Sequence, residues 1–379
     1  MKINNIFKNN LFNKFKKIYA YKNEKIFFLE DISLNGGVQR LVLDICKELN
    51  DPILTIYISK SLKSSEEIFR KYTNILQISI LELILIGLFI RLIRSKVYII
   101  HSHLSRPFYL SFLIPSFKRI YTEHNTWNKR RNILFCKYID PYFYKNYDYV
   151  VCISKGVRTC LVNFIGRYKN DANLITINNW SSNIFDIDFE NIKKLIKKRN
   201  NKFKNKKMKS IMIASFCDQK KQRNLLKLLD KFNFLEITFV GEGKYLNDFI
   251  KEVDNRKLSS RVICKGLLPS IKILELLKQN HLYLHSVEWE GFGIAVLEAM
   301  KLGLPVITSD VIGLREVIND KSSMVKNFSS KKCHKIIENL YSNSDYYFDK
   351  SIKSFQNSQR FSLKESISKY KKIYTITKK

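Results

Sequence analysis

Two glutamates late in the chain lie at a spacing that suits the binding of one long polar ligand. Glu290 and Glu298 stand in the stretch HSVEWEGFGIAVLEAMKLGLPVITSD, residues 285–310. Carboxylates accept hydrogen bonds from sugar and ribose hydroxyls. Gly291 and Gly293 carry no side chain, so backbone N–H groups can approach a ligand closely there. The pattern therefore indicates a site for a ligand that carries both hydroxyl and phosphate groups.

A strand over Leu282–His285 and a helix over Ile294–Lys301 are predicted to position these glutamates. Gly303 is a typical helix stop. Glu290 then precedes the helix N-terminus, and Glu298 lies in the second turn, where five residues rise roughly 7–8 Å. The N-terminal end of a helix favours a diphosphate. We therefore expect the two carboxylates to contact different parts of one ligand.

The same stretch resembles the signature of glycosyltransferase family 4, in which seven residues separate two glutamates. The segments EGFG, LEAM, GLPVI and GLRE follow in register between residues 290 and 316. Four matching segments are specific, whereas a bare pair of glutamates is not. The resemblance implies the GT-B fold, α/β with two Rossmann-like domains facing each other across a donor cleft. It also implies that Glu290 is catalytic and holds the sugar, that Glu298 binds the ribose, and that Gly291, Phe292 and Gly293 belong to the donor-binding loop.

Other segments of the chain resemble the same family. Gly36 and Gly37 match its N-terminal glycine loop, which approaches the donor phosphates, although two glycines after a strand are more often a plain turn. His103, in the segment HSHL, is implied as a catalytic residue near the transferred sugar. His124 and Asn125, in TEHNT, match a segment on the acceptor side less specifically. A histidine at a strand end is otherwise a common structural residue.

The loop after the first strand of the second half departs from the family pattern. Family members place an arginine and a lysine here, and both neutralise the donor diphosphate. Lys220 fits the lysine and is the implied donor-binding residue, but Ser215 occupies the arginine position. Lys221 and Arg223 are nearby without aligning. A solvated basic face is the plain alternative for these lysines. The departure is compatible with altered donor choice or with weakened catalysis.

The chain is predicted to fold as two α/β domains, because apolar segments alternate with helical patterns and 379 residues exceed one ordinary core. We assign residues 1–190 to an acceptor-side domain and 191–208 to a basic linker or exposed helix. Residues 209–355 form the nucleotide-sugar-binding domain, and 356–379 contain a helix that crosses back to the N-terminal domain. Strands are predicted at Lys25–Leu29, Ile53–Ile58, Val97–His101, Arg119–Thr122, Tyr149–Ile153, Leu174–Ile177, Ser210–Ala214, Glu236–Val240, Val262–Cys264, Leu282–His285 and Pro305–Thr308.

The formal net charge of +33 points to an anionic partner, either a membrane surface or nucleic acid. The basic residues are spread along the chain, without a zinc-finger spacing or an aromatic RNA-binding signature, so no nucleic-acid partner is expected. The seven cysteines form no CxxC pair, which favours a reducing cytoplasm and no zinc. The N-terminus lacks the apolar stretch of a secretory signal.

An apolar segment over Ile75–Ile93 has two interpretations. Its clean run, Leu83–Ile90, is too short to span a bilayer, and Arg91, Arg94 and Lys96 follow it. One interpretation is a helix buried against the sheet. The other is a helix lying in the interface of an anionic membrane.

The resemblance implies a retaining glycosyltransferase of the hexosyltransferase class. It would transfer a hexose or N-acetylhexosamine from a UDP- or GDP-sugar to a lipid-linked or saccharide acceptor in surface polysaccharide assembly. No DxD-type cluster follows a strand, so no metal or other cofactor is expected. The enzyme would act in the cytoplasm, peripherally on the inner membrane face. Two alternatives stay open: an inactive paralogue that binds sugar nucleotides, suggested by Ser215, and a basic nucleic-acid-binding protein, suggested by charge alone.

Overall fold

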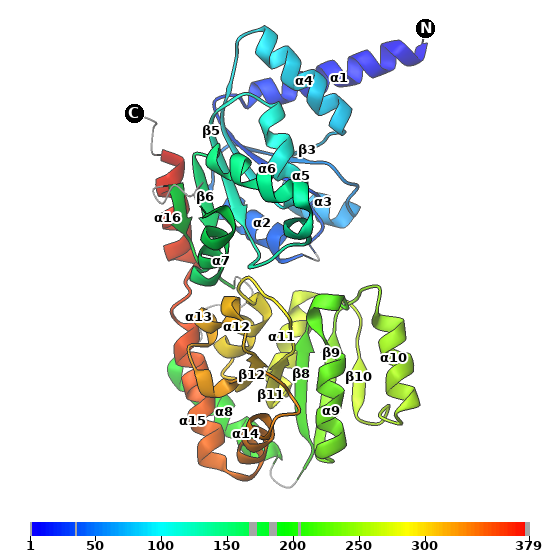
Figure 1. Cartoon of the computed structure of the whole chain (residues 1–379), viewed down its shortest axis with the longest axis vertical. Helices are drawn as coiled ribbons and strands as arrows, with labels where there is room; N and C mark the ends of the chain where they lie inside the picture. Colours follow the sequence, from blue (N-terminus) through cyan, green and yellow to red (C-terminus); the bar gives the residue numbers. More distant parts are fainter. Residues whose placement is uncertain (1, 35, 167–172, 182–187, 204–205, 376–379) are drawn as a thin grey trace. The chain divides into compact units, whose positions relative to one another are not determined.

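The chain folds into two compact α/β units, seen in a computed structural model that describes residues 2–34, 36–166, 173–181, 188–203 and 206–375 (Figure 1). Unit 1 comprises residues 1–178 and 364–379, and unit 2 comprises residues 179–363. Each unit is built on one parallel sheet. The predicted fold class of two parallel α/β domains is confirmed, and the chain passes from one unit to the other at Asn178–Asn179.

Unit 1 contains a seven-stranded sheet in the order β3-β2-β1-β4-β5-β6-β7, with every neighbouring pair parallel. β2 is buried along its whole length, as expected where helices cover both faces of a parallel sheet. The strands are β1 Lys25–Leu29, β2 Ile53–Tyr57, β3 Asn74–Gln77, β4 Val97–His103, β5 Ser116–Glu123, β6 Tyr149–Cys152 and β7 Leu174–Thr176.

Helices connect the strands of unit 1, and the last helix of the chain, α16 Leu363–Thr375, also belongs to this unit. Lys118, on β5, donates its ammonium to the carbonyls of Ile373 and Tyr374 and so satisfies the C-terminal end of α16. The other helices are α1 Lys2–Ala20, α2 Gly37–Leu49, α3 Lys63–Arg70, α4 Ile80–Leu92, α5 Ser105–Leu110, α6 Leu134–Lys145 and α7 Lys155–Ile165.

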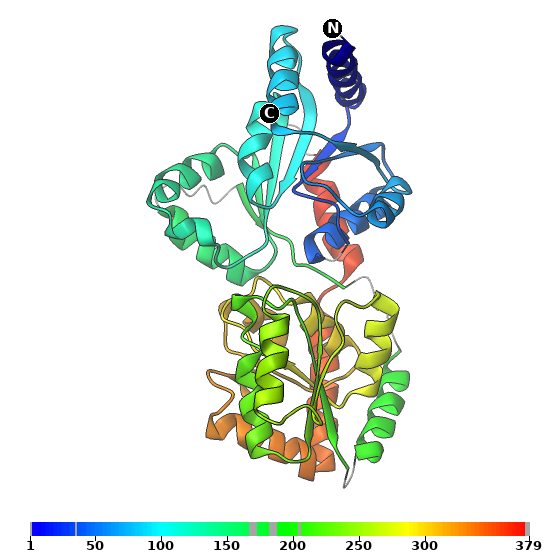
Figure 2. The same cartoon turned by 90° about the vertical axis from the view of Figure 1, so that its right-hand side faces the viewer.

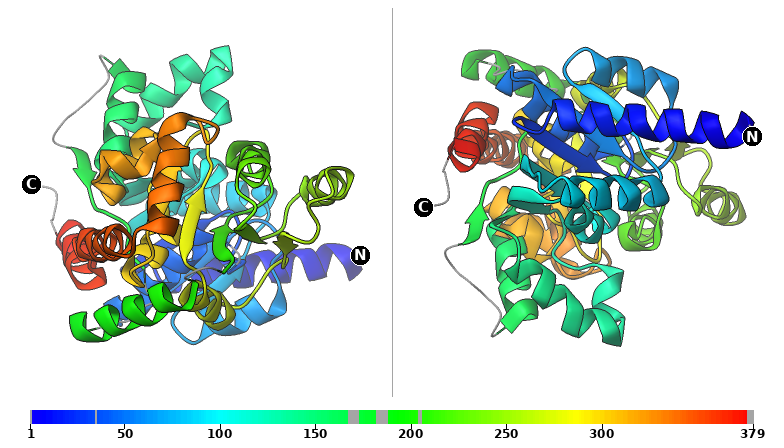
Figure 3. Two further views of the ribbon diagram at one scale, coloured as in Figure 1. Left: turned by 90° about the horizontal axis from the view of Figure 1, so that it is seen from below. Right: turned by 90° about the horizontal axis from the view of Figure 1, so that it is seen from above.

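Unit 2 contains a six-stranded sheet in the order β10-β9-β8-β11-β12-β13, also parallel throughout. Figure 3 looks along the strands and shows helices on both faces. The strands are β8 Met208–Ile213, β9 Leu235–Val240, β10 Val262–Cys264, β11 Leu282–His285, β12 Val306–Ser309 and β13 Met324–Val325. The helices are α8 Phe189–Phe203, α9 Arg223–Lys231, α10 Leu246–Asn255, α11 Ser270–Gln279, α12 Ile294–Lys301, α13 Ile312–Ile318, α14 Lys331–Ser342 and α15 Ser344–Ser358.

The segment 191–208, which the sequence suggested as a basic linker, is largely the helix α8 of unit 2. Ile192 and Ile196 lie one turn apart on its inner face and join the hydrophobic core of that unit. The guanidinium of Arg199 donates to the carbonyls of Leu302 and Gly303. The many lysines of this segment occupy the outer face, which explains why the composition resembles that of a linker.

The predicted strands agree with the structure within one to three residues at each end, but two short strands were missed. β3 lies at the start of the apolar segment Ile75–Ile93, and β13 has only two residues. The predicted C-terminal helix is divided: α15 ends at Ser358 and α16 begins at Leu363. Between them Phe361 is buried against Phe292, with ring centroids 5.1 Å apart.

The apolar segment after β3 is a helix that is buried on one side and exposed on the other, so the predicted buried helix is confirmed for its inner side. α4 buries Leu83, Ile86 and Ile90 in the core of unit 1. Its other side chains form an exposed apolar face: Ile80, Leu81, Ile84, Leu85, Leu88, Phe89 and Leu92. α1 packs beside α4 (Figure 2), through an edge-on contact of Phe15 with Phe89. Within the described residues, no helix is long and apolar enough to cross a membrane.

Candidate active site

The order of the strands in unit 2 creates a topological switch point at the carboxyl ends of β8 and β11. β8 lies between β9 and β11, so the connections that leave β8 and β11 turn to opposite sides. Ligands of open α/β sheets bind at such a switch point, outside the carboxyl ends of the strands. Lys220 lies in the loop after β8, and Glu290 lies in the loop after β11. The fold therefore brings together two residues that the sequence analysis selected separately.

Glu290 is the centre of a compact cluster of polar groups. Its Oε2 lies 2.5 Å from Nζ of Lys220 and 3.3 Å from Nε2 of His285. Its Oε1 accepts a hydrogen bond from the backbone N–H of Gly291 at 3.1 Å. The Glu290 side chain is only 15% exposed. A carboxylate, an ammonium and an imidazole are thus held together at the switch point.

The charges of this cluster follow from burial and from Lys220. Burial alone raises the pKa of the Glu290 carboxyl, but the Lys220 ammonium and the His285 hydrogen bond outweigh it and hold that pKa far below its usual range. Burial lowers the pKa of His285. The hydrogen bond to Glu290 raises that pKa by less than burial lowers it. Near neutral pH Glu290 is therefore ionised and His285 is neutral, so His285 donates to the carboxylate through Nε2.

Hydrogen bonds from side chains to backbone carbonyls fix the loop that carries Lys220 to the loop that carries Glu290. The Gln219 amide donates to the carbonyl of Trp289, and the Ser286 hydroxyl donates to the carbonyl of Lys221 at 2.9 Å. These hydrogen bonds flank Lys220 on both sides. The backbone position from which the Lys220 side chain extends is therefore fixed by the contacts of its two neighbours.

Two glycines allow the Glu290 loop to lie directly against α13. Gly293 has φ of +85°, and a Cβ there would lie 2.6 Å from the Leu314 side chain. A Cβ on Gly313 would lie 1.8 Å from the carbonyl oxygen of Glu290. Side chains at these two positions would therefore displace the loop that carries Glu290.

The other two residues predicted in this motif are buried. Glu298, on α12, is 5% exposed, and one of its oxygens lies 3.5 Å from the Ser181 hydroxyl. Phe292 packs edge-on against Phe361 in the interior of unit 2. The Phe292 side chain therefore positions the loop by packing.

The structure shows where the cations near Ser215 point. Ser215 is exposed, and its hydroxyl lies 3.6 Å from the Cys217 sulfur. Lys221 forms an ion pair with Glu288 at 2.8 Å, and Arg223 forms one with Glu252 on α10 at 2.8 Å. Both of these cations are therefore paired with acids other than Glu290. Lys220 is therefore the cation that the loop presents to the cluster.

Unit 1 holds a chain of hydrogen-bonded aromatic groups at the carboxyl ends of β4 and β5. Nδ1 of His103 lies 3.0 Å from Nε2 of His124. The His101 ring contacts the His103 ring in a tilted arrangement, with ring centroids 4.3 Å apart, and its two nitrogens lie 2.8 Å from the hydroxyls of Tyr374 and Thr122. The structure thus brings together the two histidines that the resemblance selected.

These three histidines are buried and neutral. Burial lowers the pKa of His101 and of His124 to about 3, and it holds the pKa of His103 well below its usual value. Nε2 of His103 is buried without a hydrogen-bond partner in the described part of the chain. A neutral imidazole at this place suits hydrogen bonding to a hydroxyl better than it suits charge stabilisation.

Two further predicted segments lie at the same edge of unit 1. Gly36 and Gly37 stand where α2 begins, after the loop that follows β1, and Gly36 has no side-chain cap over the first amides of the helix. The backbone N–H of Asn125 donates to Glu123 at 3.3 Å, which holds the segment after β5 in a turn. β1 and β4 are the strands between which the chain order of this sheet reverses.

Sequence reasoning missed His285 and the buried ion network beside His124. His285 is the last residue of β11, and that place at a switch point was the signal that could have found it. In the network, Arg130 forms an ion pair with Asp140 at 2.8 Å and donates to the Tyr144 hydroxyl at 2.7 Å, while that hydroxyl donates to Glu123. No local sequence motif predicts this network, because its residues lie on separate elements of the fold.

Within the residues that the structure describes, no group of three or more histidine, cysteine, aspartate or glutamate side chains is placed to hold a metal ion. The Glu290 cluster in unit 2 combines a carboxylate, an ammonium and an imidazole. Their arrangement can bind an anion and hydroxyl groups side by side.

The matched families and the fold define the class of this protein as a glycosyltransferase of the GT-B type. Residues 35–175 match Glycosyltransferase Family 4, and residues 193–357 match Glycosyl transferases group 1. The chain belongs to the glycosyltransferases that combine these two domains. The family predicted from the motif around Glu290 is thereby confirmed.

Curated relatives are identical to this chain at about a quarter of the aligned residues. An uncharacterized 41.2 kDa protein in the cps region of Klebsiella pneumoniae is 25% identical over 312 residues, which is 76% of this chain and 82% of that protein. The GPI3 subunit of phosphatidylinositol N-acetylglucosaminyltransferase from Saccharomyces cerevisiae is 24% identical over 244 residues, 62% of this chain and 52% of the subunit. The chain thus matches about half the length of the yeast relative.

Solved structures with similar folds include HepE of Anabaena in complex with UDP-glucose. That chain superposes with a TM-score of 0.75 and 17% identity, covering 93% of this chain and 100% of HepE. TarM of S. aureus, in a complex that contains UDP, superposes with a TM-score of 0.68 and 13% identity, covering 93% of this chain and 100% of TarM. At these identities the similarity establishes the fold.

Proposed function

We propose that this chain is a retaining glycosyltransferase that transfers a hexose or N-acetylhexosamine from a UDP- or GDP-sugar to a lipid-linked or saccharide acceptor in surface polysaccharide assembly. The observation that carries the proposal is the cluster of Lys220, His285 and Glu290 outside the carboxyl ends of β8 and β11. The ammonium matches a diphosphate, and the ionised carboxylate matches sugar hydroxyls that donate hydrogen bonds. A nucleoside-diphosphate sugar carries both groups next to each other.

The leaving diphosphate is stabilised by Lys220 and by the amide groups at the start of α12. In this proposal Glu290 holds Lys220 in place before the donor arrives and then accepts hydrogen bonds from the sugar. Preorganised charge of this kind is often the largest single contribution to catalysis. The reaction then needs no metal ion, because protein groups neutralise the developing negative charge.

In the proposal, the anomeric configuration of the sugar is retained because the acceptor hydroxyl attacks on the same face from which the diphosphate leaves. The acceptor oxygen forms a bond to the anomeric carbon, the bond from that carbon to the phosphate oxygen breaks, and the departing phosphate oxygen takes the acceptor proton. Glu298 binds the ribose, and the neutral His103 donates or accepts a hydrogen bond with a substrate hydroxyl. His124 orients His103 through their shared hydrogen bond.

UDP-sugars are the first donors to test. The solved HepE structure contains UDP-glucose and the TarM structure contains UDP. Ser215 stands where the family usually has an arginine. Neutralisation of the donor phosphates therefore depends more on Lys220 in this chain than in family members that have both cations.

A lipid-linked acceptor and an anionic membrane surface complete the proposal. The yeast relative is named for transfer to phosphatidylinositol, and a further relative, 28% identical over 153 residues, is an O-antigen biosynthesis glycosyltransferase of Escherichia coli. The apolar outer face of α4 lies beside the lysine-rich α1, which suits peripheral contact with an anionic bilayer at its cytoplasmic face.

A thermal-shift screen of UDP-, GDP- and ADP-sugars tests the donor assignment. A ligand at one hundred times its dissociation constant adds about 2.7 kcal/mol to the stability of the folded protein, which shifts the transition measurably. We expect one nucleotide class to stabilise the protein. A protein that no nucleotide sugar stabilises, and that instead binds nucleic acid with steep salt dependence, is not a glycosyltransferase of the proposed kind.

The exposed Ser215 favours one second candidate, a paralogue that binds sugar nucleotides without transferring them. Stabilisation by a nucleotide sugar without any turnover of a radiolabelled donor would identify it.

A further inference from the structure

The outer face of α6 in unit 1 carries a second apolar surface, separate from α4. Its side chains are between 54% and 73% exposed, which is unusual for large apolar groups so close together. Leu134, Tyr138 and Tyr142 follow at intervals of four and therefore share one side of the helix. We call this surface the α6 stripe; it consists of Ile133, Leu134, Phe135, Tyr138 and Tyr142.

Exposed cations surround the α6 stripe, and no exposed acid accompanies them. Lys129, Lys137 and Lys145 are exposed. Between His124 and Tyr147 the sequence contains a single acid, Asp140, which is fully buried and paired with Arg130. The outward face of α6 is therefore both apolar and cationic.

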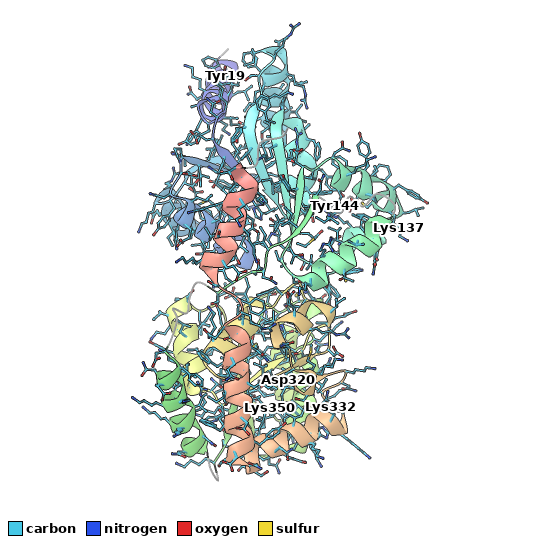
Figure 4. All side chains as sticks on the ribbon, turned by 90° about the vertical axis from the view of Figure 1, so that its left-hand side faces the viewer. Tyr19, Lys137, Tyr144, Asp320, Lys332 and Lys350 are labelled. Carbon is cyan, nitrogen blue, oxygen red and sulfur yellow. The ribbon has the colours of Figure 1, made fainter. Side chains whose placement is uncertain are left out.

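The inner face of α6 is held firmly by buried polar contacts. Tyr109 and Arg130 both bind the Asp140 carboxylate, and Tyr144 joins Arg130 to Glu123 at the end of β5. These contacts connect the helix to the strand end that precedes His124. Figure 4 shows Lys137 and Tyr144 on this helix, apart from α1, which carries Tyr19. The exposed stripe is thus part of an ordered helix and is not a frayed segment.

The shape and charge of the α6 stripe select one kind of occupant. A convex helix face cannot enclose a hydrocarbon chain, but it can enter the headgroup region of a bilayer, where tyrosine and phenylalanine side chains are favoured. Lysines without acids match anionic lipid headgroups. A symmetric contact with a second copy of this chain would instead place the lysines of both copies against each other.

We propose that the α6 stripe docks on an anionic lipid surface, as a contact independent of α1 and α4. This inference rests on the proposed function, since a lipid-linked acceptor must be met at the membrane. It adds that the edge of unit 1 bearing His103 and His124 lies near the bilayer, because α6 begins ten residues after His124 and is tied to the end of β5.

The test measures partition of the full chain into vesicles of phosphatidylcholine with phosphatidylglycerol. One variant combines Leu134→Ser, Phe135→Ser and Tyr138→Ser. Its matched control combines Leu81→Ser, Leu88→Ser and Leu92→Ser on α4, which removes three exposed apolar side chains from the other surface. We expect the α6 variant to lose roughly tenfold or more in partition coefficient, the scale of removing several partly buried apolar side chains. The same loss should be seen in the background of the α4 variant.

A reporter variant keeps the test decisive if the triple variant folds poorly. Tyr138→Trp should shift its emission to the blue on vesicles and be quenched by lipids brominated on the acyl chain. Tyr72→Trp, at an exposed tyrosine elsewhere on unit 1, should not respond. Unchanged partition of the α6 variant together with an unquenched Trp at position 138 overturns the proposal. A change of sedimenting mass in the α6 variant, with unchanged partition, would assign the stripe to self-association instead.

These readouts separate the inference from the proposed function. Vesicle binding is measured without a nucleotide sugar, and donor binding by unit 2 is measured without vesicles. If the chain docks through α6 but binds no nucleotide sugar, the proposed function fails and the docking surface stands. If it binds donor and ignores vesicles, the docking surface fails alone.

Discussion

The ammonium of Lys220 lies 2.5 Å from the Glu290 carboxylate, although 70 residues separate them in the chain. Each residue comes from a loop at the carboxyl end of a central strand of unit 2. The ion pair exists because the strand order reverses between β8 and β11 and brings the two loops together at the switch point. The distinctive chemistry of the unit is thus a consequence of its topology.

Glu290→Gln should lower turnover by roughly 10²–10³-fold, the scale of losing a key preorganised polar contact. The amide keeps the size of the side chain but no longer holds Lys220 or accepts two strong hydrogen bonds from sugar hydroxyls. Steady-state kinetics with the donor identified by thermal shift provide the measurement. Glu288→Gln is the matched control, since this neighbouring carboxylate is more than half exposed and pairs with Lys221. Near-wild-type kinetics for a folded Glu290 variant would remove Glu290 from the site.

Lys220→Ala should almost abolish transfer, because Ser215 supplies no second cation for the diphosphate. Lys221→Ala and Arg223→Ala should have small effects, as those side chains pair with Glu288 and Glu252. Rates of nucleoside diphosphate release from the three variants make the comparison. A mild Lys220 variant beside a severe Arg223 variant would show that the loop adopts another arrangement when the donor binds.

Tyr374→Phe should reduce turnover more than it weakens donor binding. Without the hydroxyl, Nδ1 of His101 loses its partner at 2.8 Å, and an unsatisfied buried nitrogen costs about 1–3 kcal/mol. The His101 ring, which packs against the His103 ring, is then free to shift. A double-mutant cycle with His101→Ala measures the coupling, and strictly additive effects on kcat would show that the Tyr374 contact only stabilises α16.

Asp320→Asn should destabilise unit 2 by about 1–3 kcal/mol near pH 7, because the carboxylate accepts hydrogen bonds from Lys350 and two serines. Figure 4 shows Asp320 beside Lys350. Burial alone raises the pKa of Asp320, but these partners hold it well below its usual range. The carboxylate therefore contributes its full stability above about pH 4 and loses it as the pH falls toward 2.

Chemical denaturation of the Asp320 variant at several pH values provides the check. Its difference from the wild type should shrink between about pH 4 and pH 2. Asp349→Asn, at an exposed carboxylate on α15, is the control. A difference that stays constant over this range would mean that the ion pair with Lys350 contributes little.

The sequence predicted most of the fold because parallel strands buried on both faces are continuous apolar segments, as in Ile53–Tyr57. It failed where an element is short or amphipathic with many lysines. β13 has two residues, too few to show a pattern in the sequence. In α8, the buried Ile192 and Ile196 are outnumbered by the lysines of the outer face.

The site divides in the same way. Glu290 and Lys220 were found because a specific motif and a family position name them. His285 and Tyr374 act through contacts that only the assembled sheet and the returning α16 create. Residues that meet through topology, without a shared motif, leave no periodic or local signal in one sequence.

Calorimetric titration of UDP into the wild type, Lys220→Ala and Lys221→Ala tests the central claim most directly, because it isolates the diphosphate site from every assumption about the acceptor. The account predicts binding of one nucleotide per chain to the wild type and to the Lys221 variant, with a loss of roughly tenfold or more for the Lys220 variant, as expected for a charge-assisted contact worth about 1.5–3 kcal/mol. GDP and ADP are titrated in parallel to identify the base. Equal affinity of both lysine variants for the preferred nucleotide, or no binding of any of the three, would contradict it.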